Sequence, residues 1–279
     1  MQSGVSRHRK ATLLPVSAAV ACVTALAGVP AFGDDGGDAS KLSAQQLADD
    51  AEKELLNAKS LHVLLKNYST GPADARSPAV LDLALDQDGN CAGSLTMGTG
   101  GAEGGTVEFI KRGDELWMKP DTTFWKSQVT GGAGELAAQF FNGRYVHGNA
   151  NDGLLKSLGD TCDLNAFQAQ VEGGPSSAPP EKLTKGKETK VDGTDVVPVS
   201  GRNDGSEVVL FITAKDPHRL VRATTKSGYL SATMKLTDYN RPVPSATPSK
   251  EESVDVSEFQ NLSPKATPPQ AAAPVRAAW

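Results

Sequence analysis

The chain has 279 residues, of which 38% are hydrophobic and 22% charged, and its formal net charge is −5 at pH 7. This length suits one domain of ordinary size with extra segments, and the apolar fraction is enough for a real core. The acidic balance argues against a nucleic acid as partner, because binding to phosphates requires a basic surface.

The first 31 residues have the pattern of an export signal. A basic cluster at residues 7–10 precedes a mostly apolar run over residues 11–33, which is the layout of a secretory signal peptide. Small residues at Val29 and Ala31 predict cleavage after Ala31. Two alternatives stay open: acylation of Cys22, and an uncleaved anchor, because the run is just long enough to span a bilayer. We therefore expect an extracytoplasmic protein, either secreted or associated with the cell envelope.

Removal of the signal leaves two cysteines, Cys91 and Cys162. In an oxidising compartment such a pair predicts a disulfide bond, the alternative being two buried free thiols. No C-x-x-C spacing or histidine cluster accompanies them, so we expect no metal site.

The segment that follows the signal changes character at residue 42. Residues 32–41 are rich in Gly and Asp and are predicted to form a flexible tether. Ser43 and Gln46 have the spacing of a capping box, and apolar residues then recur on one helical face. The sequence therefore predicts an amphipathic helix that ends near Lys59.

Alternating apolar and polar residues predict antiparallel strands in both halves of the chain. In the first half, strands around residues 61–65, 81–85, 95–97, 107–109 and 116–118 form a meander with turns at Asp88-Gly89 and Gly113-Asp114. Between residues 121 and 173 helical patterns predict short helices at 136–141, 154–158 and 164–171. Strands resume at 197–199, 208–212, 220–224 and 230–236. Short loops between consecutive strands indicate neighbours in one sheet.

Three motifs resemble the LppX and LprG type of actinobacterial lipoprotein, over roughly residues 42–259. They are Ala58-Lys59-Ser60-Leu61-His62-Val63, Leu116-Trp117-Met118-Lys119 with Phe124-Trp125 after it, and Leu236-Thr237-Asp238-Tyr239-Asn240-Arg241-Pro242. The resemblance implies an α+β fold, in which a strongly curved antiparallel β-sheet, a half-barrel, has helices packed on its concave face. It also implies a cavity for acyl chains and a role in carrying lipids or lipoglycans. The chain departs from the family at Val29, where the acylated cysteine would stand.

Residues 260–279 are predicted to be a disordered Pro/Ala-rich tail.

We therefore expect a non-catalytic binding protein for a lipid or another apolar ligand, with membrane contact compatible with this role. Such a cavity needs no sequence motif, since each buried methylene contributes about 0.8 kcal/mol. The candidate lining residues are apolar positions of the predicted strands: Val63, Leu65, Leu81, Leu83, Leu95, Val107, Phe109, Val209, Phe211, Met234 and Leu236.

The alternative is an envelope structural or protein-interaction module, in which the same side chains pack the helices onto the sheet and leave no space for a ligand. No enzymatic activity and no cofactor are predicted. His62, His147 and His218 are isolated in the sequence, and no G-x-S-x-G motif accompanies them.

Overall fold

The computed structural model describes residues 38–258, apart from residues 130, 142, 154, 174–180 and 204. The chain divides into two compact units, Met1–Asp35 and Gly36–Trp279, and the described residues all belong to the second. The predicted signal peptide, the first part of the tether, Phe259 and the predicted tail lie outside the described residues.

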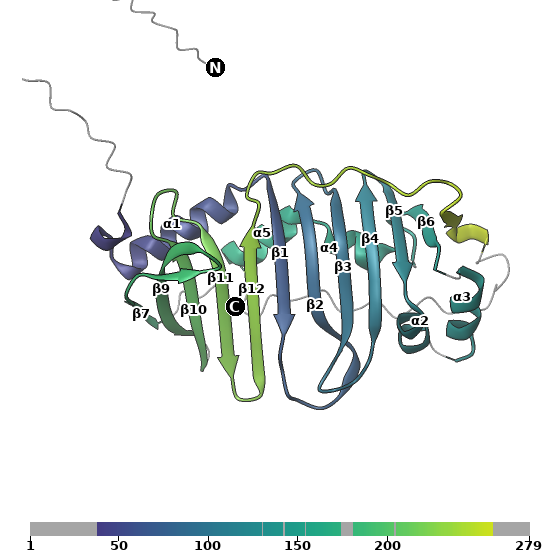
Figure 1. Cartoon of the computed structure of the whole chain (residues 1–279), viewed down its shortest axis with the longest axis horizontal. Helices are drawn as coiled ribbons and strands as arrows, with labels where there is room; N and C mark the ends of the chain where they lie inside the picture. The colour runs from purple at the N-terminus through teal and green to yellow at the C-terminus, as the bar shows by residue number, and fades with distance from the viewer. Residues whose placement is uncertain are drawn as a thin grey trace, which may run out of the picture. The chain divides into compact units, whose positions relative to one another are not determined.

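The helices and strands alternate in blocks along the chain (Figure 1). The helices are η1 (Ala39–Lys41, a 3-10 helix), α1 (Ala44–Leu56), α2 (Thr122–Gln128), α3 (Ala133–Phe141), α4 (Lys156–Thr161) and α5 (Leu164–Gly173). The strands are β1 (Ser60–Asn67), β2 (Asp74–Asp86), β3 (Cys91–Thr99), β4 (Gly105–Arg112), β5 (Glu115–Pro120), β6 (Tyr145–Asn149), β7 (Glu181–Lys185), β8 (Thr189–Val191), β9 (Thr194–Asn203), β10 (Ser206–Thr213), β11 (Leu220–Ser227), β12 (Leu230–Thr237) and β13 (Ser253–Asp255).

All thirteen strands form a single curved sheet. Its order is β13-β6-β5-β4-β3-β2-β1-β12-β11-β10-β9-β7, and β8 pairs with β9. Every pairing is antiparallel except that of β13 with β6. The meander of the first half and the meander of the last strands meet where β1 pairs with β12. The predicted α+β class with a curved antiparallel sheet is confirmed.

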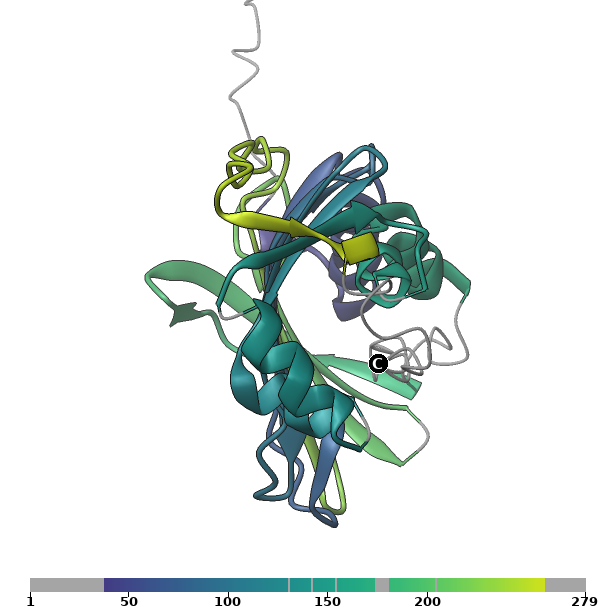
Figure 2. The same cartoon turned by 90° about the vertical axis from the view of Figure 1, so that its right-hand side faces the viewer.

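The helices α1, α4 and α5 lie behind the sheet of Figure 1, at the upper ends of the strands. Figure 2 views the sheet from its edge and shows it bending around the side on which these helices lie. The concave face is therefore the helix-covered face. Buried α5 residue Gln168 joins two of the helices, because its amide donates to the carbonyls of Leu55 and Ala58, at 2.9 and 2.8 Å.

The helix α1 forms as the sequence predicts. The Ser43 hydroxyl accepts a hydrogen bond from the backbone N–H of Gln46, and the Gln46 side chain accepts one from the backbone N–H of Ser43. Both contacts satisfy N–H groups that the first helical turn leaves unpaired. The helix ends at Leu56, three residues before the predicted end. Arg219, 3.3 Å from Glu54, anchors its outer side to the sheet.

The predicted tether is corrected at its last four residues, which are part of the folded domain. Asp38 pairs with Lys215, and the Ala39 N–H donates to the Ala214 carbonyl at 3.1 Å. Lys185 donates to the carbonyls of Ala39 and Ser40, both at 3.0 Å. These contacts between distant residues are not visible in a Gly/Asp-rich composition.

Several short elements were not predicted from the sequence. The strands β6, β7, β8 and the helix α2 are too short to show a clear period. Asp121 caps α2 by accepting the Phe124 N–H at 2.7 Å, and also accepts the Thr106 N–H at 2.9 Å. At Gly105, with φ of +80°, a Cβ atom would meet the backbone of Phe124, so this glycine permits the close packing of α2 on β4.

Candidate functional site

An unbroken row of apolar residues crosses the concave face. Residues paired across antiparallel strands have side chains on the same face, and the register therefore identifies the row without ambiguity. Leu65 on β1 pairs with Met234 on one side and with Leu81 on the other. The full row, called the apolar row below, takes one residue from each of β9, β10, β11, β12, β1, β2, β3, β4 and β5: Val199, Leu210, Ala223, Met234, Leu65, Leu81, Leu95, Val107 and Pro120.

A second level lies above the apolar row, toward the helices α1, α4 and α5. Val63 pairs with Leu236 and with Leu83, and Leu83 pairs with Gly93, which pairs with Phe109. The two levels together contain nine of the eleven residues that the sequence analysis selected. The structure thus brings these nine onto one face.

The prediction for Val209 and Phe211 is corrected, because both lie on the opposite face. Val209 pairs with Thr224 and Phe211 with Arg222, whereas Leu210 between them pairs with Ala223 of the apolar row. The cause of the error is that residues 208–212 are all apolar. Without alternating polar residues, the sequence does not indicate which of their side chains face the core. The apolar row also contains four residues absent from the predicted set, namely Leu210, Val199, Ala223 and Pro120.

Burial differs along the apolar row. Of the nine predicted residues on the concave face, eight are at most 8% exposed: Val63, Leu81, Leu83, Leu95, Val107, Phe109, Met234 and Leu236. Leu65 and Leu210 are only half-buried, although they belong to the same row. The next level below, toward the lower ends of the strands, contains half-buried Asn67, Ala232 and Thr225 and also Val208, which is 5% exposed. The apolar face is therefore closed by the helices above and only partly exposed along its lower margin, at Leu65 and Leu210.

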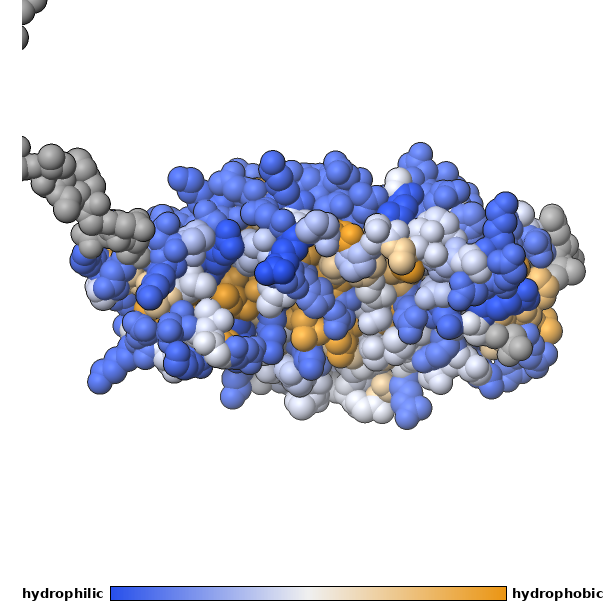
Figure 3. All heavy atoms as spheres, turned by 45° about the horizontal axis from the view of Figure 1, so that its top comes forward, coloured by the Kyte–Doolittle hydropathy of each residue, from blue (hydrophilic) through white to orange (hydrophobic). Residues whose placement is uncertain are grey.

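The opposite face of the sheet is mainly polar. His62 Nε2 lies 2.6 Å from Asp82 Oδ1 on the next strand, and Asp192 lies 2.9 Å from Arg222 and 2.7 Å from Lys235. These two cations lower the pKa of Asp192, with the hydrogen bond from Lys235 as the largest contribution. Figure 3 shows blue side chains spread over this side with orange atoms between them. This distribution is typical of a solvent-exposed face with only scattered apolar contacts.

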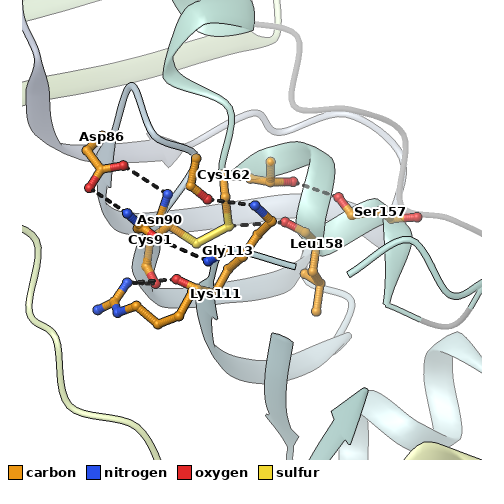
Figure 4. The surroundings of a disulfide bond; sticks show 11 residues. Asp86, Asn90, Cys91, Lys111, Gly113, Ser157, Leu158 and Cys162 are labelled. Atoms are coloured by element: carbon orange, nitrogen blue, oxygen red, sulfur yellow. Dashed lines mark hydrogen bonds between the residues drawn. A yellow bond between two sulfur atoms is a disulfide. The ribbon is translucent and has the colours of Figure 1, made fainter. Parts of the chain in front are cut away.

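The predicted disulfide between Cys91 and Cys162 is present, and both residues are completely buried. Cys91 begins β3 and Cys162 follows α4, so the bond attaches the helical cover to the sheet. Figure 4 shows the hydrogen bonds around it. Asp86 accepts the N–H of Asn90, whose side chain accepts the N–H of Gly113. These contacts hold the two neighbouring turns together beside the disulfide.

A hollow of about 290 Å³ lies beside the disulfide, at the upper ends of the strands. Its lining is polar and includes Asp88, Lys111, Asp160 and Asp163. Such a lining does not suit an apolar ligand, because charged groups would lose their hydration. This hollow is therefore distinct from the apolar row.

The three histidines of the described residues lie in separate environments. His147 stacks on Trp117, with ring centroids 4.6 Å apart, while His218 is buried with Nδ1 3.0 Å from the Thr213 carbonyl. Trp125 is buried and stacks on Phe141, with ring centroids 5.3 Å apart, which places it in the core. Within the described residues, no group of three or more His, Cys, Asp or Glu side chains could hold a metal ion.

The comparison with known proteins finds similarity in structure alone. No family model and no curated protein sequence matches the chain. The structure of LprF from Mycobacterium bovis is similar, with 18% identity, 74% of this chain and 97% of LprF covered, and a TM-score of 0.47. Lipoprotein LppX from Mycobacterium tuberculosis shows 13% identity, coverage of 72% and 97%, and a TM-score of 0.44. The chain resembles these two proteins in fold.

A more remote similarity is to the LolA superfamily protein NE2245 from Nitrosomonas europaea. It shows 11% identity, covers 76% of this chain and 97% of that protein, and has a TM-score of 0.23. Among the helices of the described part, none has the length and hydropathy needed to cross a membrane.

Proposed function

We propose that this protein is a non-catalytic binder of a lipid or another apolar ligand, and that it carries this ligand in the cell envelope. The observation that supports the proposal is the apolar row, which crosses nine neighbouring strands and is half-exposed at Leu65 and Leu210. A face of this kind would hold an aliphatic chain without specific polar contacts.

The geometry of the lower margin suits an extended chain. Leu65 and Leu210 are separated by β12 and β11, whose row residues are Met234 and Ala223. Neighbouring strands are about 4.8 Å apart, so the two leucines are separated by roughly 14 Å across the sheet. Met234 and Ala223 are 2% and 1% exposed, so an acyl chain lying across these four strands would contact Leu65 and Leu210 and pass over the buried pair between them. Each methylene removed from water would contribute about 0.8 kcal/mol.

A second candidate is a structural or protein-interaction module without a ligand. The observation in its favour is the burial of eight predicted lining residues, which pack against the helices and one another. In this case the concave face is simply the core of the domain.

The two candidates differ in what the purified protein contains. We expect native mass spectrometry to detect co-purifying lipid and a fluorescent fatty acid to bind with saturation. A protein that arrives without lipid and takes up no fatty acid would favour the module with a filled core.

Adjacent residues on β10 offer a matched pair of variants. Leu210→Gln places an amide on the concave face, and we expect it to weaken fatty-acid binding about tenfold, through the loss of roughly 1.5 kcal/mol of apolar contact. Val209→Gln changes a half-buried residue on the opposite face and should leave the affinity unchanged. Equal effects of both variants on the dissociation constant, measured by fluorescence titration, would contradict the proposed site.

A further inference from the structure

Three of the most exposed large hydrophobic residues lie at one end of the sheet. Among the described residues, Tyr68 is 56% exposed, Tyr229 62%, Leu230 49% and Leu136 57%. Tyr68 follows β1, while Tyr229 and Leu230 form the turn and start of β12. These three residues, called the tyrosine tip below, belong to loops at the lower ends of the strands in Figure 1.

Backbone contacts hold the two loops of the tyrosine tip together. The Tyr68 N–H donates to the Ser231 carbonyl at 2.7 Å, and the Thr70 N–H donates to the Tyr229 carbonyl at 3.0 Å. At Gly71 a Cβ atom would lie only 3.1 Å from the Tyr229 ring, so this loop passes close beneath the ring. The aromatic side chains are therefore exposed on an ordered support.

The charges around the tyrosine tip are unevenly distributed. The three adjoining loops, residues 68–73, 100–104 and 228–229, contain a single charged residue, Glu103. Turns at the opposite ends of the strands contain Asp88, Asp114 and Asp216. Figure 3 brings that opposite end forward, where the surface is blue along most of its length. Asp74 and Glu207 also lie at the lower end, near the starts of β2 and β10. The tyrosine tip is thus a local apolar patch at this end, whereas the opposite end is strongly hydrophilic.

Two lysines flank the tip on the convex face. Lys66 lies in β1, two residues before Tyr68. Lys226 of β11 pairs with Ser231 of β12, whose carbonyl accepts the Tyr68 N–H. Among the described residues, neither lysine has a carboxylate within 4.0 Å, although Lys226 is paired across the strands with Glu207 of β10. Lys66 is therefore the less compensated of the two charges that would face an anionic group outside the protein.

We propose that the tyrosine tip docks this protein onto a lipid bilayer with anionic headgroups. Tyrosine rings are amphipathic and favour the membrane–water interface, Leu230 would enter the acyl boundary, and Lys66 and Lys226 would face the headgroups. The proposal rests on the proposed function, because the tip lies at the same end of the sheet as the accessible margin at Leu65 and Leu210. Docking there would bring the open side of the apolar row to the membrane that supplies or receives the ligand.

The test measures co-sedimentation with vesicles, using the protein as purified and the same N-terminus in every variant. On vesicles of phosphatidylcholine with phosphatidylglycerol, the triple variant Tyr68→Ser, Tyr229→Ser, Leu230→Ser should lower the partition coefficient about tenfold or more. Leu136→Ser removes an equally exposed leucine from α3 and should have no effect. Lys66→Gln with Lys226→Gln should weaken binding to these vesicles but not to phosphatidylcholine alone.

An unchanged partition coefficient in the triple variant, or an equal loss in Leu136→Ser, would overturn the docking proposal. Fatty-acid binding without vesicles separates it from the proposed function. The triple variant should retain the wild-type affinity and circular dichroism spectrum, because its three positions are exposed and lie outside the apolar row. Tip-dependent vesicle binding by a protein that takes up no fatty acid would support docking while contradicting the carrier role.

Discussion

Carboxylates meet between two of the helices that cover the concave face. Partial burial, followed by the nearby charges of Asp49 and Glu172, raises the pKa of Glu52 above its ordinary value of 4.5. Glu52 and Asp49 lie on α1, whereas Glu172 lies on α5, so the repulsion acts across the contact of the two helices. A raised pKa in the folded state means that ionisation of Glu52 destabilises the fold.

Glu52→Gln should therefore stabilise the protein at neutral pH. Because the site is close to the surface and screened by solvent, the increase in the free energy of unfolding should be at most about 0.5 kcal/mol. The folded state binds the Glu52 proton more tightly than the unfolded state does. The destabilisation by the ionised Glu52 carboxylate is therefore present above the raised pKa and disappears as the pH falls below 4.5. Urea denaturation of both proteins at pH 7 and pH 4 measures this. A gain that persists at the lower pH would point to a cause other than charge.

Tyr239 shows how single residues hold the upper end of the sheet. Burial raises the pKa of its hydroxyl, which donates to the Leu220 carbonyl at 2.7 Å. The Arg219 guanidinium lies 5.2 Å from the centre of its ring and also contacts Glu54 of α1. The ring therefore links the end of β12, the start of β11 and the first helix. The hydroxyl remains a neutral hydrogen-bond donor throughout the physiological pH range.

At the level of elements, the cover over the concave face depends on one covalent attachment. The disulfide joins residues 71 positions apart, from the start of β3 to the junction of α4 and α5. The helices α4 and α5 are short, and isolated helices of such length are not stable in water. Their position over the apolar row thus depends on tertiary contacts, among which the disulfide and Gln168 connect them to β3 and α1.

Removal of the disulfide by Cys91→Ser with Cys162→Ser should lower the free energy of unfolding by about 4 kcal/mol, as expected for a loop of this length. Guanidinium denaturation of the double variant and of the oxidised wild type gives the difference. The reduced wild-type protein should resemble the variant. A loss below about 1 kcal/mol would show that packing alone holds the helical cover in place.

For the whole molecule, the decisive question is how much of the concave face accepts a ligand. The nine-strand row is continuous, yet its exposure is confined to the lower margin, below the helices. A ligand bound there would contact both the sheet and its cover. Binding would therefore stabilise the native state as a whole.

A fatty acid added at one hundred times its dissociation constant should raise the free energy of unfolding by about 2.7 kcal/mol. Differential scanning calorimetry would detect this as a higher Tm, and Leu210→Gln should reduce the shift at the same ligand concentration. A domain with a filled core should show the same Tm at every fatty-acid concentration.

The sequence by itself determined much of the secondary structure and its connectivity. Alternation of apolar residues predicted the strands around Leu61–Leu65 and Leu81–Leu85, and the turns at Gly89 and Gly113 confirmed the first meander. The capping box at Ser43 predicted the start of α1. The cysteine pair predicted the disulfide. These signals succeed because they depend on local geometry or on a simple count.

Only the tertiary structure decided which residues share the concave face and which of them stay accessible. The run at residues 208–212 is apolar throughout, so its two faces could be distinguished only by the pairing of β10 with β11. Composition likewise suggested a tether at Asp38–Lys41, which distant contacts with Lys185 and Ala214 hold against the domain. The partial exposure of Leu65 and Leu210, in a row whose other members are buried, is likewise a result of packing between distant elements. Register and coverage arise from contacts between residues far apart in the chain, which a local pattern does not encode.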